Sequence, residues 1–281
     1  MLRNKNLNEI LSLDPMKDHH RILFITSELE FPIDHLRALE FALFRTYAIP
    51  SISALLAQTG EFAKHGQKRY DDTSLIMAEI VEQGYDSERG HEAIRRMNNI
   101  HRHFPISNED KLYVLSTFIF EPIRWNKMLG WRLYTEHERQ ATFYFWREVG
   151  KRMNIQDIPE SFEDYERFNH DYEAKYYTYT DTNRHIADAT VDIFCRWYPA
   201  VFSPLVKIGI YALLDEPLRK AFGFPAQPAW LRWTLERVMR LRAFAIQFLP
   251  VRRRPFLFTK QKNRTYPRGY QIETLGPTET T

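Results

Sequence analysis

The chain has 281 residues, of which 15% are aromatic, with one cysteine and a formal net charge of +3. The single cysteine, Cys195, excludes an internal disulfide framework and any multi-cysteine metal centre, and it fits a reducing compartment. A charge of +3 is too small to indicate nucleic-acid binding. No secretory signal or uninterrupted membrane-spanning run is recognisable, so we expect a cytoplasmic location.

Apolar residues recur at helical spacing along most of the chain, and no segment alternates as a strand does. We therefore expect an all-α fold in which one domain, residues 21–258, lies between two tails. Residues 1–20 form the N-terminal tail, and residues 259–281, with few large aliphatic side chains, form a flexible C-terminal tail. Helices are predicted over residues 36–44, 51–58, 69–83, 87–103, 111–120, 136–153, 161–175, 182–197, 204–214 and 229–249.

Capping residues and helix breakers set these predicted boundaries. Asp34 and Asn108 occupy N-cap positions, and Thr135 with Glu138 forms a capping box. Pro50 is expected to begin a helix, and Glu121-Pro122 to kink or end one. Breaks are also expected at Gly60 and Gly66.

The helix predicted before Phe104 carries a histidine on its apolar side. At 100° per residue, Ile94, Met97, His101 and Phe104 share one stripe, whereas His103 points roughly to the opposite side. An imidazole on an apolar stripe is either a ligand or a core residue with satisfied hydrogen bonds, and spacing alone leaves both interpretations open.

Common catalytic motifs are absent from the sequence. A single Glu-x-x-His at Glu88 does not provide the paired motif of a di-iron bundle, and His-Glu-x-x-His is missing. Neither the nucleophile elbow of serine hydrolases nor a glycine-rich phosphate loop occurs. An all-helical oxidoreductase would therefore need another cofactor.

Haem b satisfies these constraints because it needs one axial imidazole, an apolar slot and a few cations for its propionates. His101 can supply the imidazole and ligate the iron. Met97 and Phe104 can contribute to the slot. The candidate propionate partners are Arg95, Arg96 and Arg102.

A second polar cluster lies in the segment KRYDDT, residues 68–73. Arg69 and Thr73 are one helical turn apart on the same face, and Asp72 is beside them. The cluster could belong to a catalytic site, or it could be a helical first turn in which acidic residues complement the helix dipole.

The C-terminal third is the basic end of the chain, with arginines from Arg232 to Arg254. This pattern fits a solvated face, or an attraction to anionic lipid headgroups. The apolar stretch of residues 197–214 is interrupted by two prolines and Lys207, which allows an interfacial contact with a membrane but not a span.

Taken together, these segments resemble the family of fungal MpaB oxygenases and bacterial rubber oxygenases (latex clearing proteins). The resemblance covers about residues 28–250. It is carried by the segments ELEFP (28–32), RTYAIPSIS (45–53), KRYDDT (68–73), MNNIHRHFPISNED (97–110), LYVLSTFIFEPIRW (112–125) and FWREVG (145–150).

The resemblance implies a globin-like helical core with haem b, and an enzyme that uses dioxygen to oxidise or cleave a lipophilic, unsaturated small molecule of isoprenoid or fatty type. His101 matches the family's proximal ligand, and Arg69 with Thr73 matches an Arg-x-x-x-Thr signature near the haem. Rubber oxygenases carry a lysine directly before that threonine, where this chain has Asp72. We expect Asp72 to accept a proton or orient water, or to mark a different distal chemistry and substrate.

An alternative of another class is a non-catalytic, helical, lipid-binding protein at the membrane periphery. It would use the aromatic core as a hydrophobic pocket and the basic C-terminal region as a surface anchor. Haem binding distinguishes the two hypotheses.

Overall fold

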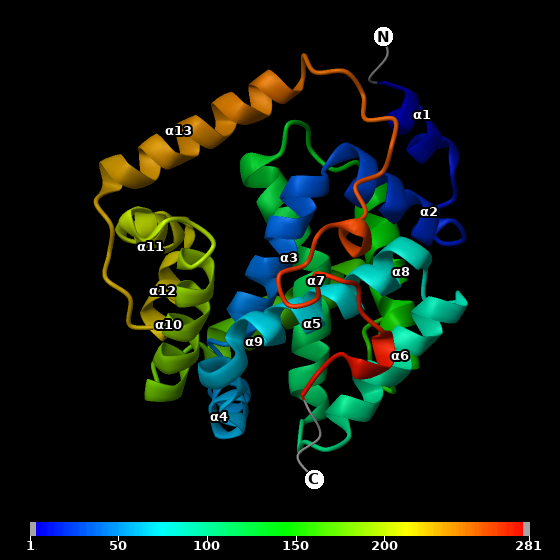
Figure 1. Ribbon diagram of the computed structural model, residues 1–281. Coiled ribbons are helices and arrows are strands. Elements are labelled where there is room, and N and C mark those ends of the chain that lie inside the picture. The colour runs from blue at the N-terminus through cyan, green and yellow to red at the C-terminus, as the bar shows by residue number, and fades with distance from the viewer. Residues whose placement is uncertain (1–3, 278–281) are drawn as a thin grey trace.

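The computed structural model describes residues 4–277, which form helices and connecting loops with no strand (Figure 1). The all-α fold predicted from the sequence is confirmed, whereas its globin-like haem-binding character stays a prediction. The α-helices are α1 (Asn4–Ser12), α2 (His19–Phe24), α3 (Pro32–Thr46), α4 (Pro50–Thr59), α5 (Glu61–Gln83), α6 (Glu88–His101), α7 (Asn108–Leu129), α8 (Glu136–Arg152), α9 (Phe162–Tyr176), α10 (Asp181–Cys195), α11 (Ser203–Leu213), α12 (Glu216–Ala221) and α13 (Ala229–Ile246). Short turns of other helix types are η1 (Ile25–Glu30), η2 (Ala200–Phe202), η3 (Phe258–Lys260) and η4 (Ile272–Thr274).

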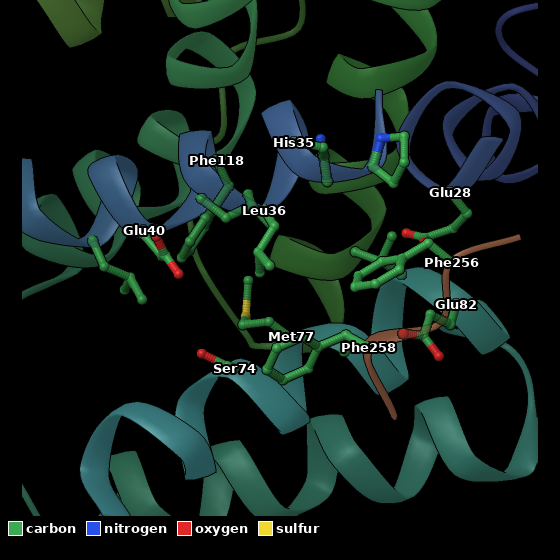
Figure 2. Close-up of a pocket in the computed structure, with 15 residues that line it drawn as sticks. Glu28, His35, Leu36, Glu40, Ser74, Met77, Glu82, Phe118, Phe256 and Phe258 are labelled. Atoms are coloured by element: carbon green, nitrogen blue, oxygen red, sulfur yellow. The ribbon is translucent and has the colours of Figure 1, made fainter. Parts of the chain in front are cut away.

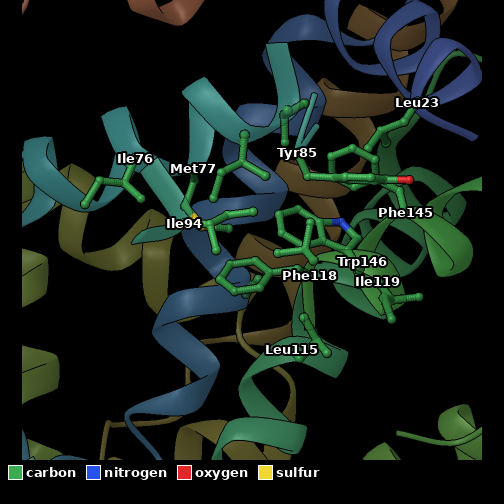
Figure 3. Close-up of a cluster of buried hydrophobic side chains, with 14 of the residues drawn as sticks. Leu23, Ile76, Met77, Tyr85, Ile94, Leu115, Phe118, Ile119, Phe145 and Trp146 are labelled. Carbon is green, nitrogen blue, oxygen red and sulfur yellow. The ribbon is translucent and has the colours of Figure 1, made fainter. Parts of the chain in front are cut away.

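The main core lies where α3, α5, α6, α7 and α8 meet (Figure 3). Its large aromatic side chains pack on one another: the rings of Phe118 and Trp146 stack with centroids 5.1 Å apart, and Phe145 meets Trp146 edge to face at 5.4 Å. Much of the aromatic content of the chain is therefore used to hold helices together.

Several predicted boundaries are confirmed, and their local causes are visible. Pro50 begins α4, and Gly60 ends it with a left-handed backbone (φ +67°) that favours glycine. The capping box of Thr135 and Glu138 is complete at the start of α8. At α7, however, Ser107 rather than Asn108 is the N-cap, accepting a hydrogen bond from the backbone N–H of Asp110.

The break predicted near Gly66 is present as a kink within α5, whereas the helix end predicted at Glu121-Pro122 is wrong for α7. α5 begins at Glu61 and continues past Gly66, with a non-helical residue at His65. A Cβ at position 66 would lie 2.9 Å from the Cδ1 atom of Ile193 in α10, so a larger residue there would require the Ile193 side chain to shift. α7 continues through Pro122 to Leu129, where tertiary packing of the buried Trp125 and Leu129 against α3 favours the helix.

Asp34 is not the N-cap of α3, because the helix begins earlier, at Pro32. The Asp34 carboxylate instead accepts hydrogen bonds from Arg242 Nη1 at 2.8 Å and from the indole of Trp125 at 3.4 Å. The residue therefore joins α3 to α13 and α7.

Both expected tails are packed on the helical body over their described residues. Near the N-terminus, Ile10 of α1 is fully buried, and the Asn6 amide donates to Glu30. Near the C-terminus, Ile272 and Leu275 belong to the main core. The tail interpretation is therefore wrong for residues 4–20 and 259–277, because a few apolar side chains spaced along each polar segment are buried.

Within the described part of the chain, no single helix is both long and apolar enough to cross a membrane. By length and composition alone, the pair α3 and α4, which is bent by 94°, would pass the same test. Many side chains of α3 are buried inside the helical body.

Candidate functional site

His101 is the last residue of α6, a helix whose N-terminus is capped by the Ser87 hydroxyl. Ile94 on the same stripe is buried, and Met97 packs against the main core. Arg102 and His103 are exposed, whereas His101 is partly withdrawn from solvent. The periodicity argument that distinguished His101 from His103 is confirmed.

The surroundings of His101 favour the neutral imidazole. Burial lowers its pKa to about 4, and the positive charges of Arg69 and Lys111 act in the same direction. A neutral imidazole is the form of histidine that ligates iron.

Arg69 and Thr73 are on α5 and touch each other. The Arg69 guanidinium donates to the Thr73 hydroxyl at 2.6 Å, and this hydroxyl donates to the Arg69 carbonyl at 3.0 Å. Both side chains line a cavity of about 30 Å³ together with Tyr47 and Phe194. Because the charge of Arg69 also lowers the pKa of His101, the structure brings the Arg-x-x-x-Thr pair and the candidate ligand into one neighbourhood.

Asp72 is separated from this pair. Its buried carboxylate accepts hydrogen bonds from Lys68 Nζ at 2.7 Å and from the Tyr266 hydroxyl of the C-terminal segment. It lines neither of the two cavities described here. Asp72 therefore does not line the cavity that Arg69 and Thr73 line, and its catalytic role stays a prediction.

The three arginines predicted as propionate partners have different environments. Arg95 and Arg102 are exposed at the surface of α6. Arg96 donates from Nε to the backbone carbonyl of Leu275 at 2.6 Å, so it holds the C-terminal segment. Phe104, predicted to line the haem slot, is half-buried just beyond the helix end. Their roles as haem contacts stay predictions.

A second cavity, of about 50 Å³, lies between α3 and α5 and shares Glu40 and Leu43 with the first (Figure 2). Most of its lining is apolar: Leu36, Leu39, Met77, Val81, Phe118, Phe256 and Phe258. Its polar members are His35, Ser74 and three carboxyl groups, those of Glu28, Glu40 and Glu82.

Burial shifts the titrating groups of this second cavity toward their neutral forms. Neither ring nitrogen of the buried His35 has a hydrogen-bond partner among the described residues, and burial lowers its pKa to about 4. Burial, together with the nearby Glu82, raises the pKa of Glu28 to about 8, and burial raises that of Glu40 to about 7. We did not anticipate this cavity from the sequence, although His35 and Glu40 interrupt the apolar spacing of Pro32, Leu36, Leu39 and Leu43.

Arg45, at the start of the segment RTYAIPSIS, belongs to a buried ion cluster. Arg45 pairs with Glu173 at 2.7 Å and with Glu121 at 3.4 Å, and its third carboxylate partner is Asp215. The cluster joins α3, α7 and α9 to the start of α12, so Arg45 has a structural role.

The donors near His101 suit haem better than a free metal ion. Among residues 4–277, no group of three or more His, Cys, Asp or Glu side chains could hold a metal ion. Haem iron requires only one protein nitrogen, which His101 offers in neutral form. Both cavities are smaller than a porphyrin, so side chains beside His101 would have to move to admit it.

Comparison with known proteins identifies the family. The model of the "ER-bound oxygenase mpaB/B'/Rubber oxygenase, catalytic domain" matches residues 36–246. The chain belongs to this family. The resemblance inferred from the sequence motifs is thereby confirmed, and the match includes Arg69, Thr73 and His101.

Three curated relatives are fungal. ER-bound oxygenase mpaB' of Penicillium brevicompactum is 31% identical over 242 residues, which cover 79% of this chain and 57% of the relative. ER-bound oxygenase mpaB of Penicillium roqueforti (strain FM164) is 34% identical over 214 residues, covering 70% of this chain and 72% of the relative. ER-bound oxygenase mpaB of P. brevicompactum is 34% identical over 208 residues. The chain spans little more than half the length of the two P. brevicompactum relatives, 57% and 53%.

Proposed function

We propose that this protein is a haem b-dependent oxygenase that uses dioxygen to oxidise or cleave a lipophilic, unsaturated small molecule of isoprenoid or fatty type. The observation that carries the proposal is the neutral imidazole of His101 beside Arg69, in a chain that belongs to a family of oxygenase catalytic domains. Haem, when bound, would supply the activation of dioxygen. His101 is the proposed iron ligand.

In this proposal, Arg69 and Thr73 provide the polar side of the site. The hydrogen bond between them fixes the guanidinium, and the positive charge of Arg69 favours the neutral form of His101. Hydrogen-bond donors held in this way can stabilise negative charge that develops on oxygen. Asp72 is left outside the proposed reaction because its carboxylate is engaged by Lys68 and Tyr266.

The lining of the second cavity favours a lipophilic substrate. Its apolar lining would exclude water from an unsaturated hydrocarbon, and the neutral Glu28 adds no charge at neutral pH. His35 would give a hydroxyl or carbonyl group of the substrate a polar contact, because both ring nitrogens lack partners among the described residues.

Absorption spectroscopy of the purified protein tests the cofactor assignment. We expect protein expressed with a haem precursor to show a Soret band that responds to dithionite and carbon monoxide. His101→Ala should lose or strongly shift this band, whereas the matched control His103→Ala, two residues away and exposed, should retain it. An unchanged spectrum in His101→Ala would contradict the ligand assignment. If the wild-type protein binds no haem even on reconstitution, the non-catalytic lipid-binding alternative is favoured.

A further inference from the structure

The outer side of α13 is apolar although it faces solvent. Side chains three and four residues apart place Trp230, Trp233, Leu241 and Phe244 on one side of the helix, with Arg237 among them. Trp230 and Leu241 are each 67% exposed, and Phe244 is 56% exposed. We call this set, with Phe248 just beyond the helix, the α13 stripe.

The opposite side of α13 is already anchored to the protein. Met239 packs with Trp125 and Leu213, and Ala243 is the one buried residue of the helix. Arg242 is held by Asp34 of α3 at 2.8 Å. Figure 1 shows α13 along the edge of the molecule, near α11. The α13 stripe is therefore a second apolar side that the described fold leaves uncovered.

The neighbouring helix adds to the exposed apolar surface. α11 contacts α13, and the segment that leads into it and its first turns expose Val201, Phe202, Leu205 and Ile208. A monomeric protein in water rarely exposes this many large apolar side chains in one region. Such a surface indicates a partner.

The charges around the α13 stripe indicate the chemistry of that partner. Residues 229–254 contain seven arginines and a single carboxylate, Glu236, which already pairs with Arg232 at 3.3 Å. Arg237 lies over the ring of Trp233, with its guanidinium carbon 5.1 Å from the ring centroid. Two tryptophans and flanking arginines on an apolar helix face are typical of a helix in the headgroup region of a bilayer.

A second copy of the chain is a poorer partner for the same stripe. Stripe-to-stripe pairing would bring Arg237 and Arg240 of one copy toward those of the other, with no free carboxylate on α13 to offset them. Anionic lipid headgroups supply the missing negative charge without bringing arginines of two copies together.

We propose that the α13 stripe docks the protein in the plane of an anionic lipid surface. α13, with 18 residues, is about 27 Å long and would lie along the membrane rather than cross it. The aromatic and aliphatic side chains would enter the acyl boundary, while Arg237, Arg240 and the run from Arg252 to Arg254 would contact headgroup phosphates. This role is independent of haem.

Vesicle flotation with the full chain tests the docking surface. We expect the wild-type protein to float with vesicles of phosphatidylcholine and phosphatidylserine and to bind vesicles of phosphatidylcholine alone about tenfold more weakly, with binding to the anionic vesicles reduced by high salt. The double variant Leu241→Asp/Phe244→Asp should lose binding. Arg237→Glu/Arg240→Glu should bind anionic vesicles at least about tenfold more weakly.

The matched control is Leu133→Asp, because Leu133 is 65% exposed on the loop before α8, outside the α13 stripe. This variant should bind as the wild type does, and circular dichroism and thermal unfolding should show that all variants are folded. The proposal is overturned if the wild type binds neither kind of vesicle, or if the stripe variants bind as tightly as the control. A dimer in light scattering that dissociates in Leu241→Asp/Phe244→Asp, without vesicle binding by the wild type, would instead assign the stripe to a second copy.

Discussion

Leu275, in the C-terminal segment of residues 259–277, should contribute as much to stability as a residue in the middle of the core. Its side chain is fully buried in the main hydrophobic cluster, and its backbone carbonyl accepts the hydrogen bond from Arg96. Leu275→Ala removes buried methyl groups and leaves a cavity, which typically costs 2–5 kcal/mol, so we expect a loss of about 3 kcal/mol in the free energy of unfolding. For a domain of this size, that corresponds to roughly 6–12 °C in Tm.

Urea and thermal unfolding, followed by circular dichroism, measure this effect. The matched control is Gln271→Ala in the same segment, where the side chain is exposed and the change should stay within about 0.5 kcal/mol. If the C-terminal segment behaved as the flexible tail that its composition indicates, both variants would unfold as the wild type does. That result would refute the packing argument for the segment.

Three other changes test separate parts of the structure. Glu28 has a pKa of about 8 in the native protein and about 4.5 when unfolded, so the native protein binds more protons between these pH values and loses stability as pH rises through them. Glu28→Gln should flatten this decline in urea titrations at different pH values, and an unchanged decline would contradict the role of Glu28. Arg45→Met should destabilise by about 3–5 kcal/mol because it leaves Glu121 and Glu173 buried with less compensation, and a loss below about 1 kcal/mol would contradict the buried cluster. Thr135→Ala removes the capping box of α8 and should lower Tm by roughly 2–4 °C, for a cost of about 1 kcal/mol; no shift would show that the cap is dispensable.

The sequence predicted the parts of this fold that depend on local periodicity. The α6 stripe predicted that His101 is less exposed than His103 because a helix has a fixed angle per residue, and the capping box of Thr135 and Glu138 acts within one turn. The errors arose where contacts between residues far apart in the sequence determine the structure. Pro122 does not end α7, because the helix beyond it packs on α3, and the break predicted near Gly66 is a kink at His65 rather than the end of α5.

The C-terminal segment shows why a sparse apolar pattern is hard to interpret. Ile272 and Leu275 are only two apolar residues in a polar stretch, too few for a periodicity to emerge. Their burial depends on α6, which is far away in sequence, where Arg96 holds the carbonyl of Leu275. No local signal in the segment could have indicated that contact.

The candidate site was predicted only in part, because some of its features also depend on contacts between residues far apart in the sequence. Arg69 and Thr73 could be paired from their spacing of four, which places both side chains on one face of α5. Whether Asp72 lines the same cavity could not be predicted from the sequence. It precedes Thr73 by one residue and so points to a neighbouring face of the helix, and either face could have met the cavity. The sequence did not indicate His35 as a site residue. Its ring lacks a hydrogen-bond partner among the described residues because side chains from α5 and from Phe256 and Phe258 enclose the cavity that it lines, and these are distant in sequence.

The C-terminal segment gives the carboxylate at position 72 a structural partner, the Tyr266 hydroxyl. Four acidic residues of α5 each accept a hydrogen bond from a hydroxyl of this segment: Asp71 from Thr265, Asp72 from Tyr266, Glu79 from Tyr270 and Glu82 from Thr259. They form one side of α5, against which the segment lies, while Arg69 and Thr73 line a cavity that none of these acids lines. A lysine at position 72 would replace an acceptor with a donor beside Lys68, leaving the Tyr266 hydroxyl without its acceptor and placing two like charges together. The carboxylate at position 72 therefore fits the way in which the C-terminal segment packs on α5.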